Sequence, residues 1–174
     1  MLRLMLLRHA KSDWSAAGTP DHERTLNRRG RETAPLMGRY MARERLLPAL
    51  VLCSTAARTR QTCDLVTAEF PHHLPIRYER RLYEASPETI IKVIAATSND
   101  VHTLLVIGHN PGLQLVALTL ANRTHAKQRE KLREKFPTAG LAVIDFDAKA
   151  WTDILPAGGA LERFVSPRDI SEAG

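Results

Sequence analysis

The sequence has few cysteines and no long apolar segment. Cys53 and Cys63 are the only cysteines in 174 residues, and they do not form a Cys-x-x-Cys pair. We therefore predict two free thiols, with no disulfide framework, zinc site or redox pair. The apolar run at 4–7 is too short for a signal-peptide core and ends at Arg8. No stretch approaches the roughly 20 apolar residues of a membrane span. We expect a cytoplasmic protein that has no membrane segment.

Several motifs of phosphate and metal chemistry are also absent. No glycine-rich loop ends in Lys-Ser or Lys-Thr, and no His-Glu-x-x-His occurs. The acidic residues are not clustered as ligands of a hard metal ion would be. A thiol phosphatase needs five residues between its cysteine and arginine, whereas four separate Cys53 from Arg58. These absences favour chemistry that uses neither a metal nor a cofactor.

Acidic residues are fewer than basic residues in this chain. The chain has 25 Lys and Arg against 19 Asp and Glu, a formal charge of +6 and a pI near 9.7. This excess favours acidic or phosphorylated partners. Aromatic residues make up 5% of the chain and no helical reading motif is present, so we do not expect nucleic acid to be the partner.

Short apolar segments alternate with helical patterns along the chain. Strands are predicted at 2–8, 50–54, 102–109 and 140–147, with a further short one at 151–155 before Gly158 and Gly159 end the pattern. Helical spacing of apolar residues occurs between these strands, and the charged stretch 123–136 is predicted as a solvated helix. The alternation predicts one α/β domain over 1–174, a three-layer α/β/α sandwich around a mostly parallel sheet.

Three of the predicted strands lead into basic or imidazole side chains. The first ends at Arg8 and His9, the second runs into the segment with Arg58, and the third ends at His109. In an open α/β sheet, ligands bind outside the carboxyl ends of the strands. If these strands are neighbours, two arginines and two histidines converge on one rim of the sheet.

Such a cluster is suited to phosphoryl transfer. Arginine offers a planar fork of donors that matches phosphate oxygens and keeps its charge at any working pH. Two arginines can bind the anion and stabilise the charge that develops during transfer. A neutral imidazole among these cations can attack phosphorus, because the surrounding charge lowers its pKa.

Five segments, in order along the chain, carry a resemblance to a known family. They are "LLRHAKSDWS" (6–15), "RTLNRRGR" (24–31), "STAARTRQT" (54–62), "VIGHNPG" (106–112) and "FPTAGLAV" (136–143). Together they resemble the histidine phosphatase superfamily, which includes the phosphoglycerate mutases. At this length the chain is most similar to the SixA-type phosphohistidine phosphatases. The resemblance implies a phosphoglycerate mutase-like fold without a large cap.

The resemblance also implies roles for particular residues. His9 would be the nucleophile that becomes phosphorylated, and Arg8, Arg58 and His109 would form the rest of the phosphate pocket. Glu84 stands where many relatives carry a general acid.

The chain departs from the family pattern next to the nucleophile. Ala10 replaces the usual glycine, so the turn after His9 cannot need a glycine-only conformation. Lys11 and Ser15 replace a glutamate and an asparagine. Lys11 would make the mouth of the pocket more positive and would contact the substrate there.

The length of the chain bears on the substrate. Little room remains for a cap over a small molecule, so an open pocket could admit a phosphohistidine presented by another protein. The basic stretch 123–135 could steer an acidic partner. A phosphatase for a small phosphorylated metabolite and a phosphate-binding module without catalysis are the alternatives.

Overall fold

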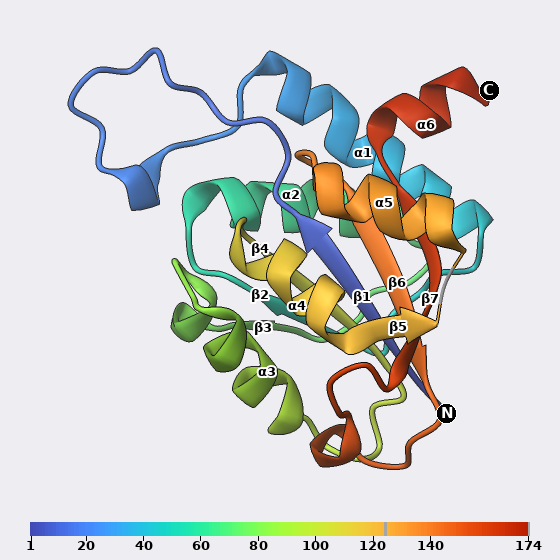
Figure 1. The fold of residues 1–174 in the computed structure, drawn as a ribbon. Coiled ribbons are helices and arrows are strands. Elements are labelled where there is room, and N and C mark those ends of the chain that lie inside the picture. The colour runs from blue at the N-terminus through green and yellow to red at the C-terminus, as the bar shows by residue number, and fades with distance from the viewer. Residues whose placement is uncertain (124, 174) are drawn as a thin grey trace.

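The computed structural model describes residues 1–123 and 125–173 (Figure 1). The strands are β1 (Leu2–Arg8), β2 (Leu50–Cys53), β3 (Ile76–Tyr78), β4 (Thr103–Gly108), β5 (Ala121–Arg123), β6 (Leu141–Phe146) and β7 (Gly159–Val165). The α-helices are α1 (Arg28–Arg43), α2 (Ala57–Thr67), α3 (Pro87–Ala95), α4 (Gly112–Leu120), α5 (Ala126–Glu134) and α6 (Pro167–Glu172). Short 3₁₀ helices lie at Asp21–Glu23, Arg80–Leu82 and Trp151–Asp153.

All seven strands form one sheet in the order β3-β2-β4-β1-β6-β7-β5. The pairs β3–β2, β2–β4 and β4–β1 are parallel, whereas β1–β6 and β6–β7 are antiparallel. The edge pair β7–β5 is parallel again. The three strands predicted to carry site residues are therefore parallel neighbours, and their carboxyl ends meet at one edge.

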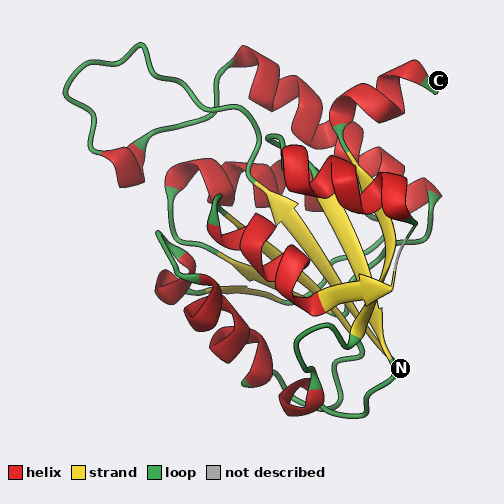
Figure 2. Cartoon of the chain, viewed as in Figure 1, coloured by secondary structure: helices red, strands yellow, loops and turns green. Residues whose placement is uncertain are grey.

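Helices cover both faces of this sheet (Figure 2). One hydrophobic core includes Leu6 of β1 and side chains of α3, α4 and α5. The other includes Leu7 of β1 and side chains of α1, α2 and α6. Successive residues of β1 thus point into opposite cores, which explains why this strand is a continuous apolar run instead of an alternating one. The predicted three-layer α/β/α sandwich is confirmed.

No large cap covers the sheet in the part of the chain that the structure describes. The longest connection between a strand and an α-helix is the loop at 9–27, which projects from the body of the molecule (Figure 1). It leaves β1 at the candidate site and returns to α1. None of the helices described is long and apolar enough to cross a membrane.

Two predictions near the C-terminus are wrong. Residues 151–155 do not form a strand, because Trp151 is fully buried in a 3₁₀ turn, where its indole N–H donates to the Val101 carbonyl at 2.7 Å. Gly159 does not end the regular structure but begins β7. A Cβ at this position would lie 2.5 Å from Cγ2 of Ile144, so glycine permits close pairing with β6.

Candidate active site

The candidate site lies at the carboxyl ends of β1, β2 and β4. Strand register sets Arg8 opposite Gly108 and Cys53 opposite Ile107, so the residues that follow these positions emerge side by side. The structure brings His9 and His109 together, with 5.4 Å between the centroids of their rings. The charges of Arg8 and Arg58 act on both histidines. The four predicted residues therefore form one cluster.

His9 is held in one orientation by its own backbone turn. Its Nδ1 lies 2.7 Å from the Ala10 carbonyl oxygen, and its side chain is almost entirely buried. A carbonyl oxygen can only accept, so Nδ1 carries the proton and Nε2 keeps its lone pair. The Ala10 N–H in turn donates to Thr62 Oγ1 at 3.0 Å, which ties this turn to α2.

The pKa of His9 is lowered to about 3, mainly because burial removes the charged form from water. The Ala10 carbonyl works against this change by favouring the cation, whereas His109, Arg58 and Arg8 add to it. His9 is thus a neutral imidazole at physiological pH.

His109 is neutral for a similar reason. Burial, followed by the charge of Arg58, lowers its pKa to about 3. Its Nε2 lies 2.7 Å from Ser54 Oγ, the residue that follows β2. Its Nδ1 is buried and has no hydrogen-bond partner among the described residues.

The two arginines keep donors available in the same place. Among the described residues, five buried side-chain nitrogen or oxygen atoms lack a partner, and Arg8 Nε, Arg58 Nε and His109 Nδ1 are three of them. Burial, and then the charge of Arg58, lowers the pKa of Arg8. The two positive charges act on each other, and an anion bound between them would offset this repulsion.

Sequence reasoning missed the acid that holds Arg58. The Arg58 guanidinium donates to the Asp21 backbone carbonyl at 2.8 Å and to its carboxylate at 3.1 Å. Tyr83 donates its hydroxyl to the same carboxylate at 2.5 Å, and Arg24 donates to it at 3.1 Å. The hydrogen bonds that this carboxylate accepts from Tyr83, Arg24 and Arg58 hold the pKa of Asp21 well below its usual range. Asp21 begins the short 3₁₀ helix within the connection at 9–27 and belongs to no motif, so no sequence signal marked it.

Tyr83 links this network to the imidazoles. Its ring meets that of His109 edge-on, with 5.5 Å between centroids. Partial burial, with the nearby Asp21 carboxylate, raises the pKa of the Tyr83 hydroxyl to about 12, so it remains a hydrogen-bond donor. Tyr83, the residue before the predicted general acid Glu84, therefore makes the contacts with His109 and Asp21.

The other residues singled out in the sequence lie next to the candidate active site and not within the cluster of two histidines and two arginines. Glu84 adjoins Tyr83 but has an exposed side chain and a left-handed backbone, with φ of 51°. Lys11 is exposed and lines a cleft next to Arg8. Ser15 is exposed and donates to Asp13 at 2.6 Å, so it makes a local turn contact. Ala10 is not among the described non-glycine residues with positive φ, in agreement with the expectation that its turn needs no glycine.

A metal centre has no obvious place here. In residues 1–123 and 125–173, no group of three or more His, Cys, Asp or Glu side chains is arranged to hold a metal ion. Arg8 and Arg58, whose charges act on His9, would repel a metal cation and attract an anion.

Comparisons with known proteins agree with this picture. Residues 4–90 match the model of the histidine phosphatase superfamily (branch 1). An uncharacterized protein from Mycobacterium tuberculosis is 43% identical over 166 residues, which cover 93% of this chain and 100% of that protein. A structure from Agrobacterium tumefaciens, assigned to the phosphohistidine phosphatase SixA, has a TM-score of 0.79 at 33% identity and covers 95% of this chain and 98% of its own. Another SixA assignment, from Nakamurella multipartitia, has a TM-score of 0.81 at 31% identity, with 95% of this chain and 96% of that chain covered.

The fold, the imidazole and guanidinium cluster at the strand ends, and these matches define a phosphatase. The chain belongs to the histidine phosphatase superfamily, and its SixA-type resemblance is confirmed.

Proposed function

We propose that residues 1–174 act as one histidine phosphatase domain that removes the phosphoryl group from phosphohistidine on a signalling protein, through a covalent intermediate on His9. No metal or cofactor takes part. Arg8 and Arg58 supply the positive charge that a metal ion provides in other phosphatases.

The observation that carries this proposal is the state of His9. Its Nδ1–H is engaged by the Ala10 carbonyl and its pKa is lowered to about 3, so Nε2 is an unprotonated nucleophile. Attack makes the ring cationic, and the same carbonyl stabilises the charge that appears on Nδ1–H. A surface histidine has neither property.

The reaction then takes two balanced steps. In the first, Nε2 of His9 forms a bond to phosphorus as the bond from phosphorus to the substrate imidazole breaks. In the second, water attacks the phosphoryl group on His9, inorganic phosphate leaves, and a proton passes to the solvent. Arg8 and Arg58 hold the phosphoryl oxygens in both steps, and His109 donates a hydrogen bond to a transferring oxygen.

The leaving group suits this site. A substrate imidazole that is protonated on its second nitrogen leaves as a neutral group, so it needs little help from a general acid. Glu84 serves as the proton donor for substrates that would otherwise leave as alkoxides. Its exposed position fits a secondary role better than an essential one.

Three features support a protein substrate in the cytoplasm. No large cap covers the site among the described residues, and the two SixA-type structures share the fold over nearly their full lengths. Cys53 and Cys63 are both buried free thiols, which are typical of proteins in a reducing compartment.

The first test compares kcat/KM on a phosphohistidine-bearing phosphotransfer domain and on p-nitrophenyl phosphate, in the presence of a metal chelator. We expect a large preference for the phosphohistidine protein. The His9→Ala variant should lose more than about a thousandfold in kcat/KM on both substrates, because no nucleophile remains. A phosphorylated His9 should be trapped by alkaline quench and found by mass spectrometry.

The matched control is His72→Ala, which removes an exposed histidine from the loop after α2 and should keep wild-type rates. An active His9→Ala enzyme would reject the mechanism. Equal, low rates on both substrates, still dependent on His9, would reject the protein substrate in favour of a small phosphorylated metabolite. Phosphate binding without turnover on any substrate would point to a binding module.

A further inference from the structure

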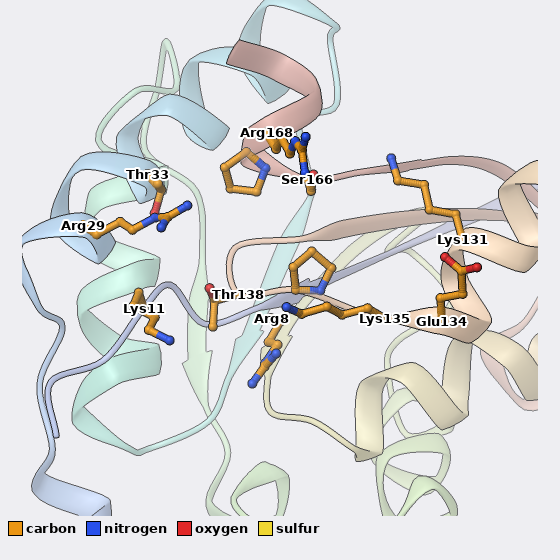
Figure 3. Close-up of a pocket in the computed structure, with 12 residues that line it drawn as sticks. Arg8, Lys11, Arg29, Thr33, Lys131, Glu134, Lys135, Thr138, Ser166 and Arg168 are labelled. Carbon is orange, nitrogen blue, oxygen red and sulfur yellow. The ribbon is translucent and has the colours of Figure 1, made fainter. Parts of the chain in front are cut away.

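A cationic cleft opens beside the candidate active site. Its volume is about 670 Å³, and it is lined by the end of β1 with the turn after it, the start of α1, the end of α5 with the loop that follows, and the start of α6 (Figure 3). Six basic side chains line this space, which we call the basic cleft: Arg8, Lys11, Arg29, Lys131, Lys135 and Arg168. Of the described residues that line it, only Glu134 carries a negative charge.

Much of this positive charge is not neutralised by the protein. In the part of the chain that the structure describes, no carboxylate forms an ion pair with Lys11, Arg29 or Lys135. Lys131 does have a partner, Asp169 of α6, at 2.5 Å. A concave surface with this much charge of one sign raises the local concentration of anions and increases their rate of association.

The cleft adjoins the place where a phosphoryl group would bind. Arg8 lines the cleft, and its charge also acts on Arg58 and His9 in the candidate active site. A substrate whose phosphoryl group lies between Arg8 and Arg58 would therefore have its neighbouring atoms at the mouth of the basic cleft. The cleft is placed to contact what flanks the phosphoryl group.

The exposure and the side-chain type of these cations indicate which chemical groups lie next to the phosphoryl group in the substrate. Arg58 is 6% exposed and held by Asp21, as a compact phosphate group requires. Lys11, Arg29 and Lys135 are exposed, and their long side chains have no ion-pair partner among the described residues. Exposed cations on long, flexible side chains match carboxylates that are spread over a protein surface.

The lining also argues against nucleic acid. The described residues of the cleft are basic, acidic, hydroxyl-bearing or proline, and none is aromatic. Single-stranded nucleic acids are bound by grooves that combine positive charge with aromatic side chains on which bases stack.

We propose that the basic cleft binds an acidic surface of the phosphorylated protein next to its phosphohistidine. This inference rests on the proposed function and adds the partner's chemistry: carboxylates that flank the phosphorylated residue. It also changes which cations matter in the basic stretch 123–135. The predicted helix is confirmed but is shorter than 123–136: α5 spans Ala126–Glu134, Arg123 lies in β5, and residue 124 lies outside the described residues. Within α5, Arg129 donates to the Ala121 carbonyl and Arg133 faces Glu130 at 3.9 Å. Among the described basic residues of this stretch, only Lys131 and Lys135 line the cleft.

The test reverses charge inside and outside the cleft. The double variant Arg29→Glu/Lys135→Glu changes two lining residues that have no part in the chemistry. The control Lys92→Glu/Lys149→Glu makes the same change in net charge at exposed positions that do not line the cleft. In the cleft variant we expect kcat/KM for the phosphohistidine protein to fall by about tenfold or more, and that for p-nitrophenyl phosphate to change by less than about twofold. The control should keep the wild-type rate on both substrates.

Changing the partner completes the test. Replacing carboxylates that flank the phosphohistidine by amides should slow the wild-type reaction and cause little further loss in the cleft variant. An equal effect of the cleft and control variants would overturn the proposal, as would an equal loss on both substrates. Stronger competition by a single-stranded RNA than by the unphosphorylated acidic domain would also overturn it.

A binding measurement separates this inference from the proposed function. The acidic phosphotransfer domain is titrated with the His9→Ala variant at low salt, and binding is measured by fluorescence anisotropy. This measurement does not depend on turnover. Binding that is lost on adding Arg29→Glu/Lys135→Glu supports the cleft even if the wild-type enzyme hydrolyses no phosphohistidine, in which case only the proposed function fails. Absence of binding overturns the cleft proposal, whatever the enzyme hydrolyses.

Discussion

At the scale of single residues, the candidate site depends on how a few polar groups are held. His9 is kept neutral by burial and oriented by its own backbone, and Arg58 is held through Asp21. The Asp21 carboxylate has a second consequence, because it places a negative charge against the guanidinium that would bind phosphate. It both positions Arg58 and competes with the anion.

Asp21→Asn separates these two effects. The hydrogen bond from Arg58 to the backbone carbonyl of residue 21 remains, at 2.8 Å in the wild type, while the negative charge is lost. Because the Asp21 side chain is partly exposed, we expect a modest change: the inhibition constant of inorganic phosphate should fall by about two- to fivefold. Steady-state inhibition measurements would show it.

Asp13→Asn is the matched control, since Asp13 lies in the same loop but accepts its hydrogen bonds from Ser15. It should leave phosphate inhibition unchanged. Weaker inhibition in Asp21→Asn would mean that positioning of Arg58 outweighs the repulsion between the carboxylate and phosphate.

At the scale of elements, α1 supports the turn that carries the nucleophile. Asn27 caps this helix by accepting from the Gly30 N–H at 2.9 Å, and the Asn27 N–H donates to the Lys11 carbonyl at 3.0 Å. Gly30 lies directly against that carbonyl. A Cβ at position 30 would stand 2.1 Å from the Lys11 oxygen, so no side chain fits unless backbone moves.

Gly30→Ala should therefore disturb the segment that leads from His9. We expect a loss of about 1–3 kcal/mol in the free energy of unfolding, as in other overpacked sites, and a fall of about tenfold or more in kcat/KM of the folded enzyme. Denaturant unfolding and kinetics at a temperature where the variant is folded would measure both.

Gly38→Ala on the same helix is the control. Its Cβ would stand 2.6 Å from the Val66 carbonyl oxygen of α2, so we expect a similar loss of stability away from the candidate site. The activity per folded molecule should stay near that of the wild type. Equal activity of the two variants would show that α1 does not set the geometry of the His9 turn.

At the scale of the whole molecule, burial of two histidines makes stability depend on pH. His9 and His109 have pKa values lowered to about 3 in the folded protein, against about 6.5 in the unfolded chain. Between these values the unfolded state binds more protons, so the free energy of unfolding falls as pH falls. The loss begins near pH 6.5 and continues downward, in a range where most carboxylates are still ionised.

We expect each histidine to lower the free energy of unfolding by about 1.4 kcal/mol per pH unit once the pH is well below 6.5. Chemical denaturation at several pH values from 6.5 to 5 would give the slope. The double variant His9→Gln/His109→Gln should show a much smaller slope, whatever its absolute stability. Replacing the exposed His72 and His73 by glutamine should keep the wild-type slope, and a double site variant that also keeps it would contradict the lowered pKa values.

Sequence patterns predicted the regular elements well where one local signal was decisive. Buried strands such as β1 and β4 are short apolar runs, and α3 begins directly after a serine cap, Ser86, which accepts from the Thr89 N–H at 3.2 Å. The prediction failed at 151–155, where a buried tryptophan needed a partner for its indole N–H and found it at Val101, 50 residues away.

What the sequence alone determined is the chemistry that the chain offers: Arg8, His9, Arg58 and His109 at the ends of apolar segments, within motifs of one superfamily. Local patterns are enough for this because each residue lies at the end of, or shortly after, an apolar segment that the sequence itself marks as a strand. Only the tertiary structure decided how burial and neighbouring charges set the protonation of these groups, and which other residues lie beside them. The hold of Asp21 on Arg58 and the meeting of α1, α5 and α6 around the basic cleft join residues far apart in the chain. Burial, electric field and concave shape arise only when distant segments pack together, so a local pattern could not reveal them.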